Sequence, residues 1–97
     1  MNFEQRIQET IREMMTLGYK PQAFITMMIT DGTVNAVKKL INSSKIPDGF
    51  VKLWEMNRLD LSVENIIQEI EWEELFTEDE RNKAKKRLKD YGYCNTV

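Results

Sequence analysis

A chain of 97 residues with a hydrophobic content of 41% is long enough to bury one core and too short for two, so we expect one domain over residues 1–97. Its 14 basic and 16 acidic residues give a net charge of −2, which excludes a global electrostatic attraction to nucleic acid or an anionic membrane. A single cysteine and no histidine exclude an internal disulfide and a His/Cys metal site.

The first 17 residues have the pattern of an amphipathic helix. Phe3, Ile7, Ile11 and Met14 recur at helical spacing, and Gly18 provides a left-handed stop. This N-terminal stretch has no apolar run of the signal-peptide kind, and no segment of the chain has the length of a membrane span. We therefore expect a soluble protein of the cytoplasm.

A second helix is predicted to begin at Pro21, which suits the first turn of a helix. Residues 23–29 leave this helix almost no polar face, which indicates burial on several sides and a central position in the fold. Asp31 and Gly32 interrupt the pattern, and Thr33 is the expected cap of a third helix that runs to about residue 41.

Three further helices are predicted in the second half of the chain. Asp48 is the expected cap of a fourth helix, and Ser62 is the expected cap of a fifth that runs to about residue 70. Thr77 and Glu80 form a capping box for a last helix, which Gly92 ends. No strand pattern is found. The expected fold is all-α: a compact orthogonal bundle of about six helices around a buried second helix.

The densest polar cluster surrounds a tryptophan in the fourth helix. Trp54, Glu55, Arg58 and Asp60 are a candidate partner-binding site, with Tyr91 and Tyr93 as possible aromatic neighbours, because an aromatic plane beside a guanidinium holds planar or anionic groups. The alternative is structural: Trp54 belongs to the core, and Arg58 pairs with Glu55 or Asp60 to fix the end of the helix.

Charge is unevenly distributed in the last third of the chain. Residues 59–80 carry acids and no base, whereas residues 81–89 carry bases and no acid. Such a stripe is typical of phosphate-backbone binding, for which the candidate residues are Lys83, Lys86 and Lys89, helped by Lys38 and Lys39. The same pattern also suits a solvated helix whose charges complement its dipole, and this interpretation is preferred.

Catalytic and cofactor chemistry has no support in the sequence. No histidine is available as a general base, and Cys94 lies within the last four residues, where chain ends are usually mobile. The acids of residues 69–74 are spaced as a solvated run without a glycine-shaped metal loop, and no phosphate-binding glycine motif is present. We therefore expect a non-enzymatic protein without cofactor or metal.

Several strings of the sequence together resemble a small bacterial helical domain that has no assigned function. The resemblance covers about residues 18–93 and rests on Tyr19-Lys20-Pro21, Asp48-Gly49-Phe50, Leu53-Trp54-Glu55, the stretch 58–64, Leu75-Phe76-Thr77, Arg87-Leu88 and Tyr91-Gly92-Tyr93. It implies a domain found alone or appended to larger, sometimes nuclease-like proteins, and carries over no catalytic residue. Many such domains have a proline near residue 70; its absence here predicts a fifth helix without a break.

From this resemblance and the missing catalytic groups, the expected function is a bacterial binding or regulatory module. It would recognise a protein partner or its own copy, with nucleic-acid binding through the basic residues of the last helix as the alternative.

Overall fold

The computed structural model describes residues 1–93, and Cys94 lies outside them. Within this range the fold is all-α and contains no strand, which confirms the expected class. The elements in chain order are α1 (Phe3–Thr16), α2 (Gln22–Asp31), α3 (Thr33–Asn42), α4 (Asp48–Glu55), the 3₁₀ turn η1 (Leu59–Leu61), α5 (Val63–Ile66), the 3₁₀ segment η2 (Ile70–Leu75) and α6 (Glu78–Asp90).

The first helix has the predicted length and face. Asn2 and Gln5 form a reciprocal capping box at its start, which satisfies backbone N–H groups that have no partner inside the helix. The hydrophobic stripe of α1 is buried, and the chain turns away at Gly18, whose φ of 89° is the left-handed conformation that glycine adopts without a Cβ penalty.

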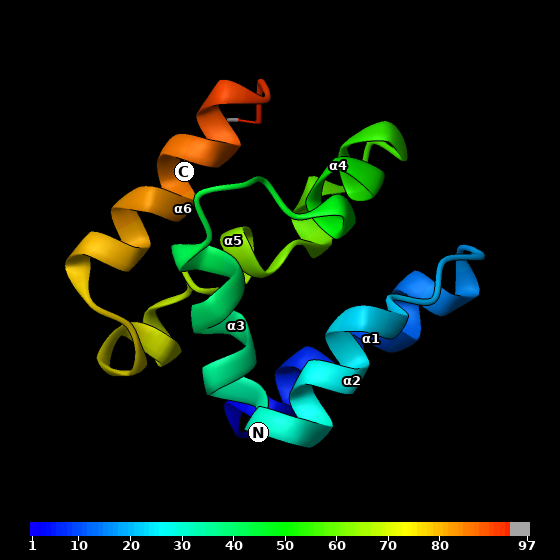
Figure 1. Cartoon of the computed structure of the whole chain (residues 1–97), viewed down its shortest axis with the longest axis horizontal. Coiled ribbons are helices and arrows are strands. Elements are labelled where there is room, and N and C mark those ends of the chain that lie inside the picture. Colours follow the sequence, from blue (N-terminus) through cyan, green and yellow to red (C-terminus); the bar gives the residue numbers. More distant parts are fainter. Residues whose placement is uncertain (94–97) are drawn as a thin grey trace.

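The centre of the fold is built by α3, α5 and α6, not by the second helix. Ala36 and Val37 of α3, Ile66 of α5 with the adjoining Ile67, and Ala84 of α6 are fully buried in one cluster. In Figure 1, α5 lies in the middle of the molecule, with α6 on one side and α1 and α2 together on the other. The small residues Ala36 and Ala84 let α3 and α6 approach this centre closely.

The prediction that the second helix is buried was wrong. Phe24 is its one buried residue, and Ile29 remains 82% exposed. The physical reason is that α2 separates two hollows at the surface. Phe24 and Met27 line one hollow, whereas Ile25, Met28 and Ile29 line a second, shallower one against α1. A helix can therefore be hydrophobic around most of its circumference and still lie at the edge of the fold.

Two of the predicted caps are displaced by one residue. The residues at the cap positions of α3 and α4 are Gly32 and Pro47, and neither provides a side-chain hydrogen bond. Thr33 instead begins α3 with its side chain buried, because the positive φ of Gly32 joins α2 to α3 directly. Asp48 begins α4, where its negative charge complements the positive end of the helix dipole.

The caps of α5 and α6 are confirmed. Ser62 Oγ accepts a hydrogen bond from the Asn65 backbone N–H at 3.3 Å, and Thr77 and Glu80 form the predicted capping box. Gly92, with a φ of 79°, follows the end of α6 as expected.

The prediction of an unbroken fifth helix was wrong, because α5 ends at Ile66 and the backbone is extended at Glu69. The Glu69 carboxylate accepts two hydrogen bonds from Arg6 of α1, at 3.1 and 2.7 Å, and one from Trp72 Nε1 at 2.8 Å. These contacts hold the chain in the extended conformation that separates α5 from η2. A proline is not needed for the break.

None of the helices within residues 1–93 combines the length and the hydrophobicity that crossing a membrane requires.

Candidate functional site

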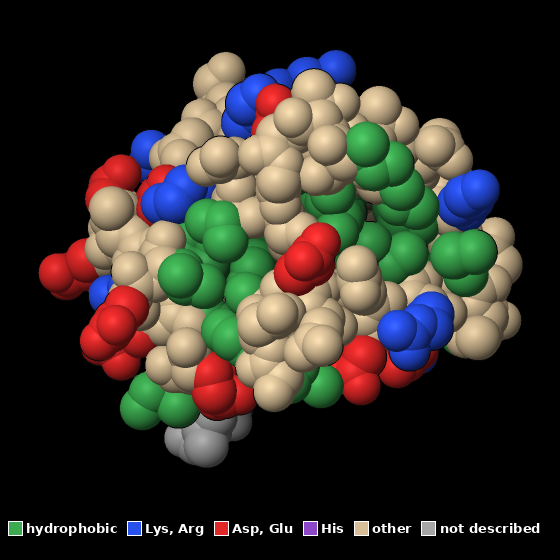
Figure 2. All heavy atoms as spheres, turned by 90° about the horizontal axis from the view of Figure 1, so that it is seen from below, with side chains coloured by type: hydrophobic (Ala, Val, Ile, Leu, Met, Phe, Trp, Pro, Cys, Tyr) green, Lys and Arg blue, Asp and Glu red, His purple; other side chains and the backbone are tan. Residues whose placement is uncertain are grey.

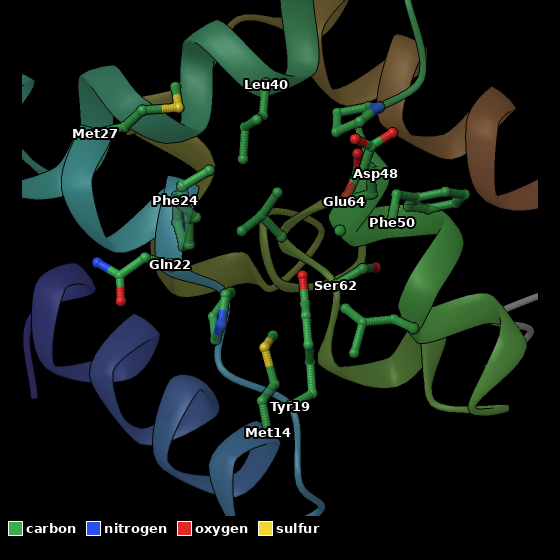
Figure 3. A pocket seen from close by; sticks show the side chains of 16 residues that line it. Met14, Tyr19, Gln22, Phe24, Met27, Leu40, Asp48, Phe50, Ser62 and Glu64 are labelled. Carbon is green, nitrogen blue, oxygen red and sulfur yellow. The ribbon is translucent and has the colours of Figure 1, made fainter.

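A pocket of about 250 Å³ opens between the C-terminal end of α1, the start of α2, α4 and the start of α5. Its walls are mostly hydrophobic: Met14, Phe24, Met27, Leu40, Phe50 and Leu53 all line it. Figure 3 shows all of these except Leu53 labelled around one central space, together with the polar residues Tyr19, Asp48, Ser62 and Glu64. A largely apolar hollow with a few convergent polar groups is the usual form of a binding site.

Tyr19 forms one wall of the pocket because the helix beside it carries a glycine. A Cβ atom at Gly49 would lie 3.2 Å from the Tyr19 hydroxyl oxygen, which is tighter than an ordinary contact. Burial raises the pKa of the Tyr19 hydroxyl above its usual value, and the negative charge of Asp48 raises it further. The hydroxyl therefore stays protonated at neutral pH and is able to donate a hydrogen bond into the pocket.

Glu64 also lines the pocket and, at 2% exposed, is the most buried charged residue of the described chain. Its Oε2 accepts a hydrogen bond from Arg87 Nη1 at 2.8 Å. Burial raises the pKa of the Glu64 carboxyl, and the hydrogen bond from Arg87 opposes this rise without cancelling it. The same guanidinium donates to the carbonyl oxygens of Leu40, Ile41 and Ser43, so it also closes the end of α3.

The four residues predicted as a partner-binding site divide into two groups. Arg58 donates from Nε and Nη2 to the two carboxylate oxygens of Asp60, both at 3.0 Å, and forms a further ion pair with Glu13 of α1. These two acids raise the pKa of Arg58. The pairing of Arg58 with Asp60 is the one that the structural alternative predicted, whereas the pair with Glu13, which joins this segment to α1, was not predicted. The role of Arg58 and Asp60 in partner binding is untested.

Trp54 and Glu55, in contrast, face solvent. Trp54 is 48% exposed and is not part of the core, contrary to the structural alternative. Its ring contacts Tyr91 edge to face, with 5.4 Å between centroids, and Tyr91 contacts Phe50 in the same way at 5.1 Å. Phe50 in turn lines the pocket, so this aromatic row connects the pocket to the exposed indole.

The five lysines of the nucleic-acid alternative lie on α3 and α6, and four of them have a carboxylate partner. The pairs are Lys38 with Glu80 at 2.7 Å, Lys39 with Asp31 at 2.8 Å, Lys83 with Asp79 at 3.2 Å and Lys86 with Asp90 at 2.9 Å. Among the five, Lys89 alone forms no ion pair in the described chain. The basic stripe is thus largely balanced by acids on its own surface.

Within residues 1–93 no group of three or more acidic, cysteine or histidine side chains is arranged to hold a metal ion. The acids of residues 69–74 do not converge: Glu69 is bound to Arg6 and Trp72, whereas Glu71, Glu73 and Glu74 are exposed.

Sequence reasoning missed the pocket and the buried Glu64–Arg87 pair. Tyr19 and Pro21 of one string and Asp48, Gly49 and Phe50 of another line the pocket, and both strings carry the resemblance described above, but nothing in their spacing shows that they meet. One signal was available. The hydrophobic circumference of α2 exceeded what one core contact requires, and such an excess indicates an apolar surface that remains open.

The fold and the site together define a small all-α domain with an apolar pocket and a buried ion pair beside it. Comparisons with protein-family models, with curated proteins and with solved structures each found no match. The resemblance to a bacterial helical domain therefore stays a prediction.

Proposed function

We propose that this protein is a non-enzymatic binding module of the bacterial cytoplasm, and that its pocket takes up a side chain of a partner protein. The observation that carries the proposal is the hydrophobic pocket itself. Met14, Phe24 and Leu53 are buried in the fold and still present surface to an open space. Filling such a space removes apolar surface from water and stabilises the complex.

The size of the pocket supports a protein partner. Pockets that hold drug-sized ligands and cofactors usually measure about 300–1,000 Å³. A volume of about 250 Å³ lies below this range and suits one side chain better than a cofactor. The exposed Trp54, held against Tyr91, supplies the kind of rigid aromatic contact that is enriched in binding hot spots.

Substitutions on α2 test the proposal with a matched control. Ala23 lines the pocket and is exposed, so Ala23→Phe adds a ring at the entrance without overfilling the core. Thr30 is exposed on the same helix and does not line the pocket, which makes Thr30→Phe the control. Each tagged variant is used as bait in the native cell, and captured proteins are quantified beside the unmodified chain.

We expect Ala23→Phe to lose a partner that both Thr30→Phe and the unmodified chain capture, with equal melting temperatures for all three. A partner that is another copy of the chain supports self-association through the same pocket. Equal capture by the two phenylalanine variants refutes the role of the pocket.

Nucleic-acid binding receives less support, because four of the five lysines are paired with carboxylates. Phosphate binding through such a stripe depends steeply on salt concentration. A mobility shift of mixed-sequence DNA or RNA at low salt that disappears as salt rises would favour this alternative.

A further inference from the structure

The charges that line the pocket are of one sign. Asp48 and Glu64 are its two charged lining residues, and neither lysine nor arginine lines it. Asp48 is exposed at the rim and forms no ion pair within residues 1–93, so its charge is available to a ligand. Glu64 shares its charge with Arg87, which lies behind it and does not face the space. Figure 3 shows the Asp48 and Glu64 carboxylates at the same side of the pocket.

Three aromatic residues line the same space: Tyr19, Phe24 and Phe50. The faces of aromatic rings carry partial negative charge and attract cations, most strongly the planar guanidinium group. Aliphatic walls from Met14 and Leu53 complete the pocket, and they fit the hydrocarbon stem on which lysine and arginine carry their charge.

Figure 2 shows hydrophobic side chains that reach one face of the molecule in more than one group, with acidic and basic side chains beside them. A cationic side chain that enters the pocket keeps its charged end near the carboxylates of Asp48 and Glu64 and its stem in contact with the apolar walls.

From this complementarity we infer that the side chain bound by the pocket is cationic, an arginine or a lysine of the partner, with its charged end at Asp48. The inference rests on the proposed function and specifies the chemistry of the partner. The same chemistry is found in free organic amines, and the experiment below separates the two sources.

Small probes test the charge preference directly. n-Butylguanidinium carries the cation, n-butylurea is its neutral isostere, and pentanoate is an anion of similar length. Each is titrated into protein labelled with ¹³C at the methionine methyl groups. Met14 and Met27 line the pocket and report binding there, whereas Met15, which does not line it, reports non-specific effects.

We expect n-butylguanidinium to shift Met14 and Met27 and to bind about three- to tenfold more tightly than n-butylurea, because one ion pair and one cation–π contact distinguish them. Asp48→Asn removes this preference. Glu74→Gln, which removes the same charge from an exposed position outside the pocket, retains it.

The inference is overturned if n-butylurea or pentanoate binds as tightly as n-butylguanidinium or more tightly. It is also overturned if the preference for the cation survives Asp48→Asn, or if no probe shifts Met14 and Met27. Partner capture that is lost in Ala23→Phe but not in Asp48→Asn leaves the proposed function intact and refutes the cationic side chain. A third outcome is that the protein binds n-butylguanidinium but Ala23→Phe causes no loss of a captured partner. That outcome assigns the pocket to a free amine and refutes the partner side chain.

Discussion

Removal of the Arg87 guanidinium is the substitution that we expect to cost most stability. Arg87→Met keeps a long apolar stem on α6 and removes the partner of a carboxylate that is 2% exposed. A buried charge without a partner costs about 3–5 kcal/mol. Part of this loss, about 1–2 kcal/mol, comes from the hydrogen bonds to the backbone carbonyls at the end of α3.

Urea unfolding followed by far-UV circular dichroism measures the effect. For a small domain the free energy of unfolding falls by about 1–3 kcal/mol per molar urea, so the midpoint at pH 7 is expected to fall by roughly 2 M. The matched control is Lys89→Met on the same helix. Lys89 is exposed and forms no ion pair in the described chain, so its substitution should change stability by less than about 0.5 kcal/mol.

A second variant separates the charge from the lost hydrogen bonds. In Glu64→Gln/Arg87→Met no charge is buried, and the double variant should recover at least half of the stability that Arg87→Met loses. Because the folded-state pKa of Glu64 lies above its unfolded value, the folded state binds more protons between the two, and its stability falls as pH rises through that window. The deficit of Arg87→Met should therefore shrink when the pH is lowered from 7 toward the unfolded pKa.

A loss of less than about 1 kcal/mol in Arg87→Met, or a double variant as unstable as the single one, would refute the account of Glu64 as a buried charge that depends on Arg87.

Two further predictions concern the ion pairs of Arg58 and Glu80. Arg58→Ala should lower the melting temperature by less than Arg87→Met does. It should leave partner capture unchanged, because the guanidinium is engaged with Asp60. Loss of capture without loss of stability would assign Arg58 to the binding site. Burial alone would raise the pKa of Glu80, but hydrogen bonds from Lys38, from the backbone of the capping box and from Asn42 outweigh it and lower the pKa to about 2. The stability from this group is complete above the unfolded pKa and is lost as pH falls from about 4.5 toward 2. Glu80→Ala should therefore cost about 1–3 kcal/mol at pH 7 and progressively less in acid. A pH-independent difference in unfolding free energy between the variant and the unmodified chain would contradict this.

The sequence predicted those elements whose determinants are local. The capping boxes and glycine stops act within a few residues, so the roles of Thr77, Ser62 and Gly92 could be assigned correctly from their neighbours in the chain. The all-α class followed from helical periodicity, which is also a local property.

The errors arose where distant residues decide. Whether α2 is central or peripheral depends on what packs on each of its sides, and a hydrophobic circumference is compatible with both a central helix and a helix between two hollows. The end of α5 depends on Arg6, 63 residues before Glu69 in the chain, which holds that glutamate in an extended conformation. The pocket likewise forms from segments that the folded topology brings together.

The central claim, that a partner protein enters the pocket, is tested most directly by photo-crosslinking in the native cell. A benzophenone amino acid is incorporated at Ala23, on the pocket wall, and separately at Thr30, at the other end of the same helix. The account predicts a covalent adduct with a partner from position 23 that is absent or much weaker from position 30. Adducts of equal yield from both positions, or an adduct from position 30 alone, would contradict it.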